Sequence, residues 1–325
     1  MSDVQEKCSV CQALIDEEDL FCSNCGTEAY HPDAMRVTTK VTTHVFKCRG
    51  CGASMSYDAA SQALRCPFCG SGELERNQDQ LSVSPKFVVP ATVGQAQAEA
   101  ALRKWLGSSF WRPSDLAASA VVRNMSLVYV PFWVFRANTY TYWTADSSVT
   151  PRSASGDWVP VTGHHRSQYA GLLVGASSVL ATGEIRGIEP YDFSQAVPVE
   201  SFDLDAVTYE QFRVPRKYAR PFARNGFEQW EAESCKQYVA GRCRNMKVNI
   251  RFESMASDPV LLPCWIMAYQ YKGQVYRFLL NGQTGKPTGT APTSYWKIAL
   301  VLGGVAAAIL GGLACAGMCA GLLAV

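Results

Sequence analysis

The sequence is poor in the residues on which catalysis most often depends. Its 325 residues contain only four histidines, and the one adjacent pair, His164 and His165, has no serine or cysteine elbow motif beside it. Neighbouring residues on a strand point to opposite faces, so we assign this pair a surface or core role. The phosphate-loop motif is also absent, because Gly282 to Lys286 is too short and falls in an expected β turn. We therefore expect a protein that is not an enzyme.

Acidic residues are absent from the end of the chain, and a positively charged stretch is absent from its start. No Asp or Glu follows Asp258, and the first residues lack the positive region and apolar run of a secretory signal. The formal net charge of +2 gives the whole chain little attraction for nucleic acid. We expect the part of the chain before its apolar end to be cytoplasmic.

Polar side chains are absent from Ile298 to Val325. An apolar run of about 20 residues is long enough to cross a bilayer as a helix. Positive residues such as Lys286 and Lys297 flank this run without compensating acids, as is typical of the cytoplasmic side. We predict a single-pass transmembrane tail anchor over residues 293–325, in contact with membrane lipid; a buried helix in a soluble core is the alternative. The spacing of Gly317 and Gly321 leaves room for close approach of a second helix, so self-association is open, although small residues are common in membrane helices in any case.

Cysteine, in contrast, is abundant near the start of the chain. Eight of the 13 cysteines form four C-x-x-C pairs within the first 69 residues. In a cytoplasmic protein such pairs indicate metal binding, and four thiolates form a closed, structural zinc site. We predict two zinc ions in two ribbons; sequential pairing is simpler than cross-bracing, which the spacing leaves open. The predicted ligands are Cys8, Cys11, Cys22 and Cys25, then Cys48, Cys51, Cys66 and Cys69. Gly26, Gly52 and Gly70 follow knuckle cysteines, where a tight turn favours glycine.

The remaining cysteines before the tail, Cys235, Cys243 and Cys264, are isolated, and we expect them in the core.

The charges of the two ribbons differ. Residues 1–35 carry eight acidic side chains and only Lys7, a surface that repels phosphate. The second ribbon carries Arg49, Arg65 and other basic residues against Asp58, so nucleic acid or an acidic partner is open to it, although a solvated surface is favoured. The basic cluster from Arg213 to Arg224 is followed by intermixed acids, so we interpret it as a solvated helix face; contact with anionic lipid headgroups is the alternative.

The pattern of the body predicts an α+β fold that is rich in strands. We divide the chain into ribbon 1 (1–35), ribbon 2 with a linker (36–80, the linker at 71–80), a β-rich body (81–292, with a division into two related β units left open) and the tail (293–325). Helices are expected at 93–106, capped by Thr92, at about 115–123 and at 216–240. Strands are expected at 36–47, 126–148, 157–169, 247–253, 260–271 and 274–280.

One short pattern occurs twice. Val128 to Trp133 and Val260 to Trp265 both read Val-x-x-Pro-x-Trp at the start of a long apolar stretch. Proline inside a sheet is confined to strand starts, edges and bulges. Two equivalent strands in one sheet, two related β units, or chance would each account for the repetition.

The order of these motifs resembles a family of bacterial membrane-anchored zinc-ribbon proteins. The resemblance rests on KCRGCGASMSYDAASQALRCPFCGSGEL, VYVPFWVF, VLLPCWIMAYQYKGQVYRFLLNGQTGKPTG and the apolar tail, from about Val45 onward. Such proteins are described as having transcription-factor-IIB-type zinc ribbons or as relatives of the primosomal protein N-prime helicase, whose ATPase motif is absent here. The resemblance implies a role in membrane stress beside band-7 (SPFH) and phage-shock-protein-A-type partners.

Together these observations predict a non-enzymatic, membrane-anchored adaptor that presents two cytoplasmic zinc ribbons to protein partners. The alternative is a membrane-tethered nucleic-acid-binding factor associated with replication or transcription.

Overall fold

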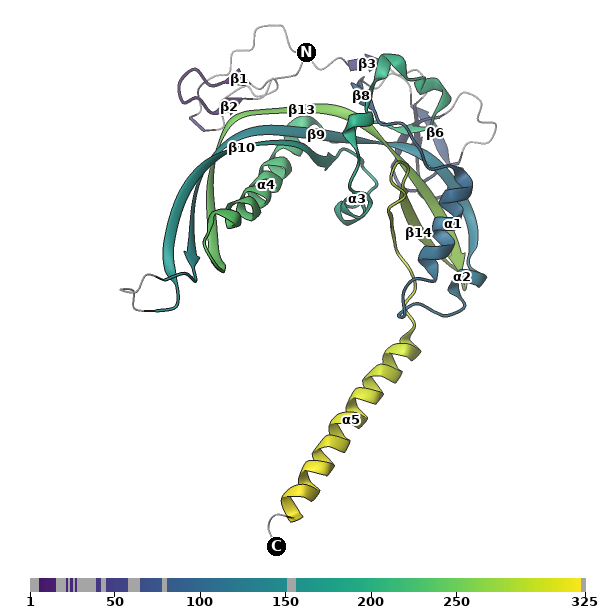
Figure 1. Cartoon of the computed structure of the whole chain (residues 1–325). Helices are drawn as coiled ribbons and strands as arrows, with labels where there is room; N and C mark the ends of the chain where they lie inside the picture. Colours follow the sequence, from purple (N-terminus) through teal and green to yellow (C-terminus); the bar gives the residue numbers. More distant parts are fainter. Residues whose placement is uncertain are drawn as a thin grey trace.

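The molecule is an arch of long, curved strands from which a C-terminal helix extends (Figure 1). The computed structural model describes residues 6–15, 22, 24, 25, 27, 39–41, 45–57, 65–77, 81–150 and 156–322. Four strands build the arch: β9 (Val121–Ser147), β10 (Val159–Gly175), β13 (Cys243–Tyr271) and β14 (Gln274–Asn281). β13 pairs antiparallel with β9 over nearly the whole length of both strands, and β10 and β14 extend this pair on opposite sides.

β13 is a single strand where the sequence predicts two. Residues between 253 and 260, including Ser257 and Asp258, have low strand propensity and a proline behind them, so they were expected outside the sheet. The structure pairs them with β9 (Ser257↔Phe135, Asp258↔Val134), and register shifts in β13 accommodate the irregularities. Hydrogen bonding to a long neighbouring strand therefore overrides local preference here.

The two Val-x-x-Pro-x-Trp motifs lie side by side at the centre of this pair. Val130 is directly opposite Leu262, and Tyr129 and Pro131 face Pro263 and Leu261, so the two motifs are related by a local two-fold axis. The same order of elements surrounds each motif. β8 (Phe87–Val88), α1 (Gln95–Leu106), β9 and β10 correspond to β12 (Tyr209–Glu210), α4 (Arg216–Cys235), β13 and β14.

The two tryptophans of the motifs continue this correspondence. Trp133 Nε1 donates to the Val214 carbonyl, just before α4, and Trp265 Nε1 donates to the Val93 carbonyl, just before α1; both distances are 2.8 Å. Each long strand is thereby attached to the helix of the other repeat.

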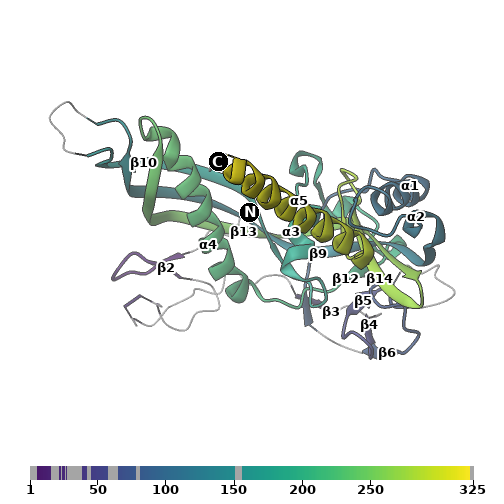
Figure 2. The same ribbon diagram turned by 90° about the horizontal axis from the view of Figure 1, so that it is seen from below.

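The observed helices lie where the sequence predicts them, but some of their ends differ from the prediction. α1 has Gly94 as its N-cap, and Thr92 instead donates its hydroxyl to the Gln283 carbonyl at 2.6 Å. α2 (Leu116–Ser119) is shorter than expected because β9 already begins at Val121. α4 lies on the concave face of the arch, against β9, β10 and β13 (Figures 1 and 2). The backbone of α4 approaches β10 closely at Gly226, where an added Cβ would lie 2.6 Å from Leu172 Cδ1.

Short elements complete the fold. The stretch 71–80, expected as a linker, includes β6 (Leu74–Asn77), which pairs with β4 (Val45–Cys48). Of the expected strand 36–47, residues 36–38 and 42–44 fall outside the described residues. The remaining strands are β1 (Glu6–Lys7), β2 (Leu14–Ile15), β3 (Thr39–Val41), β4 (Val45–Cys48), β5 (Ser54–Ser56), β6 (Leu74–Asn77), β7 (Leu81–Val83), β11 (Val197–Pro198) and β15 (Pro287–Gly289). The short 3₁₀ turns are η1 (Phe193–Gln195), η2 (Val199–Ser201), η3 (Leu204–Ala206) and η4 (Lys236–Tyr238).

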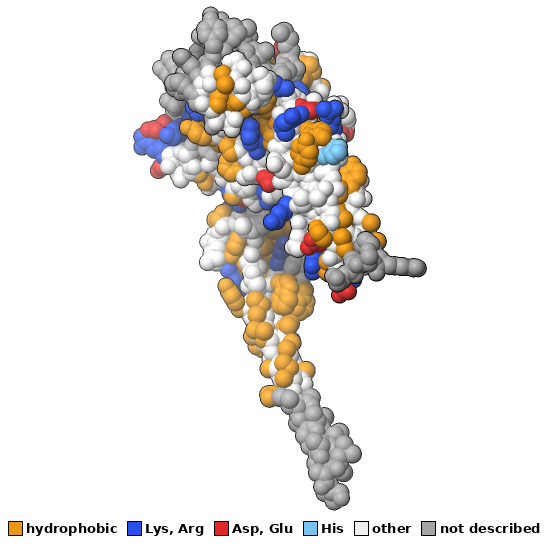
Figure 3. Space-filling view, turned by 90° about the vertical axis from the view of Figure 1, so that its left-hand side faces the viewer, with side chains coloured by type: hydrophobic (Ala, Val, Ile, Leu, Met, Phe, Trp, Pro, Cys, Tyr) orange, Lys and Arg blue, Asp and Glu red, His pale blue; other side chains and the backbone are white. Residues whose placement is uncertain are grey.

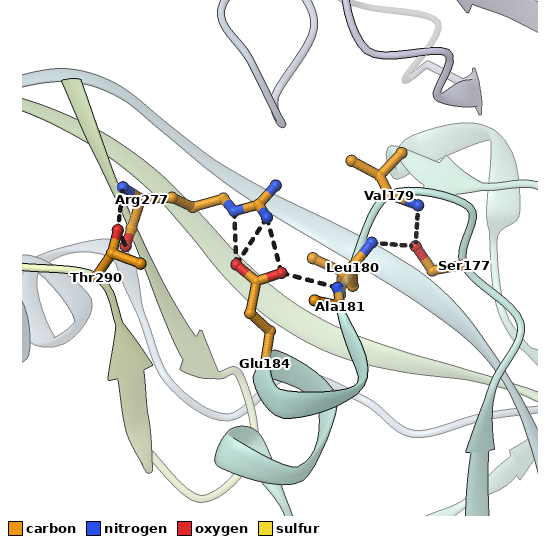
Figure 4. Close-up of polar contacts among 7 residues, drawn as sticks. All are labelled: Ser177, Val179, Leu180, Ala181, Glu184, Arg277 and Thr290. Atoms are coloured by element: carbon orange, nitrogen blue, oxygen red, sulfur yellow. Dashed lines mark hydrogen bonds and ion pairs between the residues drawn. The ribbon is translucent and has the colours of Figure 1, made fainter.

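A bidentate ion pair connects α3 (Thr182–Ile188) to β14. Arg277 donates through Nε and Nη2 to the two carboxylate oxygens of Glu184, at 2.8 and 2.7 Å (Figure 4). One of these oxygens also accepts from the backbone N–H of Ala181, so Glu184 caps its own helix while it holds the strand. Both side chains are largely shielded from water, which strengthens the charge-assisted bonds.

The C-terminal helix α5 (Tyr295–Leu322) corrects the sequence prediction. Within the part of the chain that the structure describes, no helix is both long and apolar enough to cross a membrane. The predicted transmembrane tail anchor at 293–325, and with it the single-pass membrane location, is therefore wrong on this finding. The self-association motif at Gly317 and Gly321 falls outside the described side chains.

Candidate metal centres

The four thiols of Cys8, Cys11, Cys22 and Cys25 gather at one point beside the β1–β2 hairpin. Their sulfurs all lie within 4.8 Å of one another. Cys8 Sγ is 3.5 Å from Cys25 Sγ, and Cys11 Sγ is 3.5 Å from Cys22 Sγ. We call this group cluster 1. Its first and third cysteines are buried, and its fourth is exposed.

Cys48, Cys51, Cys66 and Cys69 form a second group of the same kind, which we call cluster 2. Cys48 Sγ lies 3.5 Å from Cys69 Sγ, and Cys51 Sγ lies 3.5 Å from Cys66 Sγ. The order of buried, half-buried and exposed thiols repeats that of cluster 1. The structure thus groups the cysteines sequentially, which was the simpler of the two arrangements that the spacing allowed.

The same backbone turn carries each cysteine pair. In all four pairs the N–H of the first cysteine donates to the carbonyl five residues later, as from Cys48 to Ala53 at 2.8 Å. In three pairs the carbonyl of the first cysteine accepts from the N–H four residues later, as from Gly52 at 2.9 Å. The residue at that fourth position has a positive φ in each of these pairs: 61° at Gln12, 79° at Gly52 and 76° at Gly70. The expected role of Gly52 and Gly70 is confirmed, whereas Gly26 lies outside the described residues.

These distances fit a tetrahedral metal ion better than any bond between the sulfurs. A disulfide needs a sulfur separation of about 2.05 Å, whereas four sulfurs around zinc at about 2.3 Å are roughly 3.8 Å apart. Four thiolates would fill the tetrahedral coordination of such an ion and leave no open position for a reacting molecule. The clusters are suited to a metal ion such as zinc, and their ligand set also fits related thiophilic metals.

The protonation of the thiols depends on their surroundings. The Thr27 hydroxyl, 3.1 Å from Cys25 Sγ, lowers the pKa of that exposed thiol to about 6. Burial raises the pKa of Cys51 to about 11. A bound metal ion would hold all four thiols of a cluster as thiolates and release their protons.

Cluster 2 is part of the main sheet. β5 pairs antiparallel with β12, and β12 pairs with β9 through Tyr209 and Tyr129. The side chains of Cys48, Cys66 and Phe68 belong to the same buried cluster as Val128 of β9. Cluster 1 is arranged differently, since Cys8 and Cys22 pack with Ile15 in a small apolar cluster of their own.

The basic surface expected on ribbon 2 is partly neutralised by residues that the sequence places after it. β6 lies beside β4, and Glu75 of β6 forms an ion pair with Arg49. This pair raises the pKa of Arg49 and lowers that of Glu75. The arginine cluster of residues 213–224 is likewise not uniformly solvated, because Arg216 is buried against the ring of Trp133. On the face shown in Figure 3, acidic, basic and hydrophobic side chains are interspersed.

A third group of ligand-type side chains went unnoticed in the sequence. His165 of β10 meets Glu231 and Cys235, which lie one turn apart on α4. The expectation that Cys235 and Cys264 are core residues is confirmed by their full burial, whereas Cys243 is half-buried. Cys235 is not isolated, however, because it lies beside His165 and Glu231. The only local signal was the spacing Glu-x-x-x-Cys, which places two ligand types on one helix face.

A β-rich sheet that carries two four-cysteine clusters near its N-terminus is the class of protein that the fold and the clusters define. No family model matches the chain, and no solved structure does. The chain is similar to a protein described as "Uncharacterized protein YdjG" of Bacillus subtilis (strain 168), with 23% identity over 321 residues, covering 80% of this chain and 94% of that protein. This description assigns no activity, so the comparison supports a shared chain organisation and carries no function.

Proposed function

We propose that this protein is a non-enzymatic zinc-ribbon adaptor, whose two ribbons present a rigid surface to a protein partner. The observation that carries the proposal is the knuckle turn repeated at four cysteine pairs, with the sulfurs of each cluster 3.5 Å apart in the pairs that contact. Closed sites of four thiolates supply folding energy and no chemistry, so a binding role follows from them more directly than a catalytic one.

Charge favours a protein over nucleic acid as the partner. Binding to phosphates requires uncompensated Lys and Arg, but Arg49 of ribbon 2 is paired with Glu75. The family that the chain resembles points to band-7 and phage-shock-protein-A-type proteins as the first partners to test.

Metal analysis of the purified full chain tests the zinc half of the proposal. We expect each cluster to hold one ion, and a Cys22→Ser or Cys66→Ser substitution to remove the ion of its own cluster only. Cys264→Ala is the matched control, because Cys264 is equally buried and lies outside the metal-type clusters. A zinc content that does not fall by one ion with each serine substitution would contradict the assignment.

Binding measurements test the adaptor half. The purified full chain should bind a band-7-type or phage-shock-protein-A-type protein, and the doubly substituted Cys22→Ser, Cys66→Ser chain should lose that binding while Cys264→Ala retains it. Equal binding by all three chains would overturn the role of the ribbons. A salt-sensitive gel shift with nucleic acid near physiological salt would replace the adaptor by the nucleic-acid-binding alternative.

A further inference from the structure

The group of His165, Glu231 and Cys235 lies between the concave face of the sheet and α4. Its three potential ligand atoms are all within 4.8 Å of one another. His165 Nε2 is 2.9 Å from Glu231 Oε2, and His165 Nδ1 is 4.0 Å from Cys235 Sγ. An imidazole nitrogen, a carboxylate oxygen and a thiol sulfur thus converge from two elements that are far apart in the sequence.

The contact between histidine and glutamate is close, yet it is not a hydrogen bond of acceptable geometry. Among the described residues, His165 Nε2 and Glu231 Oε2 are both buried polar atoms without a hydrogen-bond partner. Two ligand atoms at about 2.0–2.1 Å from a tetrahedral zinc ion are separated by roughly 3.3 Å. The 2.9 Å separation is close to this spacing, so a small adjustment of the two side chains lets both atoms face one cation.

Burial makes a cation at this point energetically useful. The side chain of Glu231 is fully buried, and its other oxygen accepts from the Thr139 hydroxyl. A carboxylate removed from water costs several kcal/mol unless a positive charge compensates it. The group in contact that can supply such charge is His165, whose side chain is only 10% exposed.

Further polar atoms surround the group without partners. Thr141 lies directly opposite His165 in the β9–β10 ladder, and its buried hydroxyl has no hydrogen-bond partner among the described residues. Tyr169 Oη likewise has no hydrogen-bond partner among the described residues. Tyr169 lies on the same face of β10 as His165, four residues further on, and its ring packs against Trp230 of α4. Such hydroxyls are suited to hold a water or other small ligand on an ion with an open position.

A nucleophilic site made from the same residues is less well supported. Thiol, imidazole and carboxylate stand in the order of a nucleophile, a base and an orienting group. However, Cys235 is fully buried, and burial raises the pKa of its thiol to about 11. A substrate could not reach this buried sulfur.

We propose that His165, Glu231 and Cys235 bind a divalent zinc-type ion, as a third metal site of this chain. The mixed nitrogen, oxygen and sulfur ligands are those of zinc sites with fewer than four protein ligands, in which a water or a small exogenous ligand completes the coordination. One nitrogen of His165 lies within 4.8 Å of the ligand atoms of both other residues. Unlike clusters 1 and 2, this site has only three protein ligands, so a water molecule completes the coordination.

The first experiment is zinc analysis of the full chain. We expect one ion more than the two that clusters 1 and 2 hold, and we expect Cys235→Ala to remove one ion while Cys264→Ala, an equally buried control, removes none. Glu231→Gln, which preserves the size of the side chain, should also remove one ion. If the unsubstituted chain holds two ions and Cys235→Ala still holds two, the third site is overturned and the two ribbons stand.

Cobalt substitution distinguishes this site from the ribbons if a variant folds poorly. The charge-transfer absorption of cobalt scales with the number of thiolate ligands, so the third site should contribute roughly a quarter of the intensity of a site with four thiolates. Cys235→Ala should remove that contribution and leave the ribbon bands unchanged. Loss of a ribbon ion in Cys66→Ser with the Cys235-dependent band intact supports the third site independently of the adaptor proposal. A cobalt spectrum that is identical with and without the Cys235 thiol overturns it.

Discussion

Single residues decide the geometry of the cysteine turns. Gly52 and Gly70 occupy the left-handed region that costs a residue with a Cβ roughly 1 kcal/mol or more, and Gln12 occupies it without being glycine. The sequence revealed the glycines, because a C-x-x-C-G pattern is local. It did not reveal that Gln12 takes the same conformation, since glutamine carries no such signal.

Substitutions at Gly52 and Gln12 should change the metal affinity of their clusters in opposite directions. Gly52→Ala should weaken metal binding by cluster 2 about fivefold, because roughly 1 kcal/mol of backbone strain opposes the turn. An added Cβ at Gly52 would meet no atom within 4 Å, so the cost is conformational alone. Gln12→Gly should strengthen cluster 1 by a similar factor. Competition with a chromophoric chelator measures both, and Gly72→Ala, equally open but without a positive φ, is the control.

The buried carboxyl of Glu210 predicts a dependence of stability on pH. Burial raises its pKa to about 7, whereas a glutamate in an unfolded chain titrates near 4.3. The folded state therefore holds the proton more tightly, and the stability that this group contributes is fully present below about pH 4.3 and is lost as the pH rises through about 7. The loss amounts to roughly 3–4 kcal/mol, the equivalent of the shift.

Glu210→Gln should remove this dependence, because glutamine keeps an oxygen that accepts from the Ser178 N–H. Relative to the unsubstituted chain, the variant should gain free energy of unfolding between pH 5 and pH 8. Denaturant unfolding at several pH values measures the difference, with Glu200→Gln on the protein surface as the control. A difference that does not change with pH would show that Glu210 does not titrate in this range.

At the scale of elements, the sequence was informative wherever the pattern was local. The periodic stretches of α1 and α4 and the strands of the Val-x-x-Pro-x-Trp motifs were recognisable from their own residues. The continuity of β13 through Ser257 and Asp258 was not, because it depends on pairing with β9. Nor could the sequence show that His165 meets Cys235, since strand and helix are brought together only by packing.

The local two-fold relation predicts matched effects of two substitutions. Trp133→Phe and Trp265→Phe each remove an indole N–H that donates to a backbone carbonyl at 2.8 Å. Leaving the carbonyl without this donor and reducing ring volume should each time cost about 1–3 kcal/mol of unfolding free energy. Denaturant unfolding should give two values within about 1 kcal/mol of each other. Trp111→Phe, at a half-exposed position, should change little; strongly unequal values for the first two would argue against equivalent roles.

At the scale of the whole molecule, the two metal clusters should differ in their effect on stability. The thiols of cluster 2 share a buried cluster with β9, whereas those of cluster 1 pack apart from it. Cys66→Ser should therefore lower the melting temperature of the entire sheet by several degrees, because metal loss exposes part of the main core. Cys22→Ser, at an equally buried position, should leave the main transition almost unchanged. Thermal melting followed in the far ultraviolet tests this, and identical shifts would contradict it.

The ladder between β9 and β13 also has a mechanical consequence. β9 and β13 are hydrogen-bonded to each other along nearly their full length. A change in the curvature of the arch would therefore displace the two strands relative to each other and strain the hydrogen bonds between them. In Figure 1, α1 lies near one end of the arch, and α4 lies on the concave face in the other half. The separation of α1 and α4 is consequently set by the paired strands and not by the loops that join the helices to them. A partner that contacts both helices therefore meets two surfaces at a fixed distance.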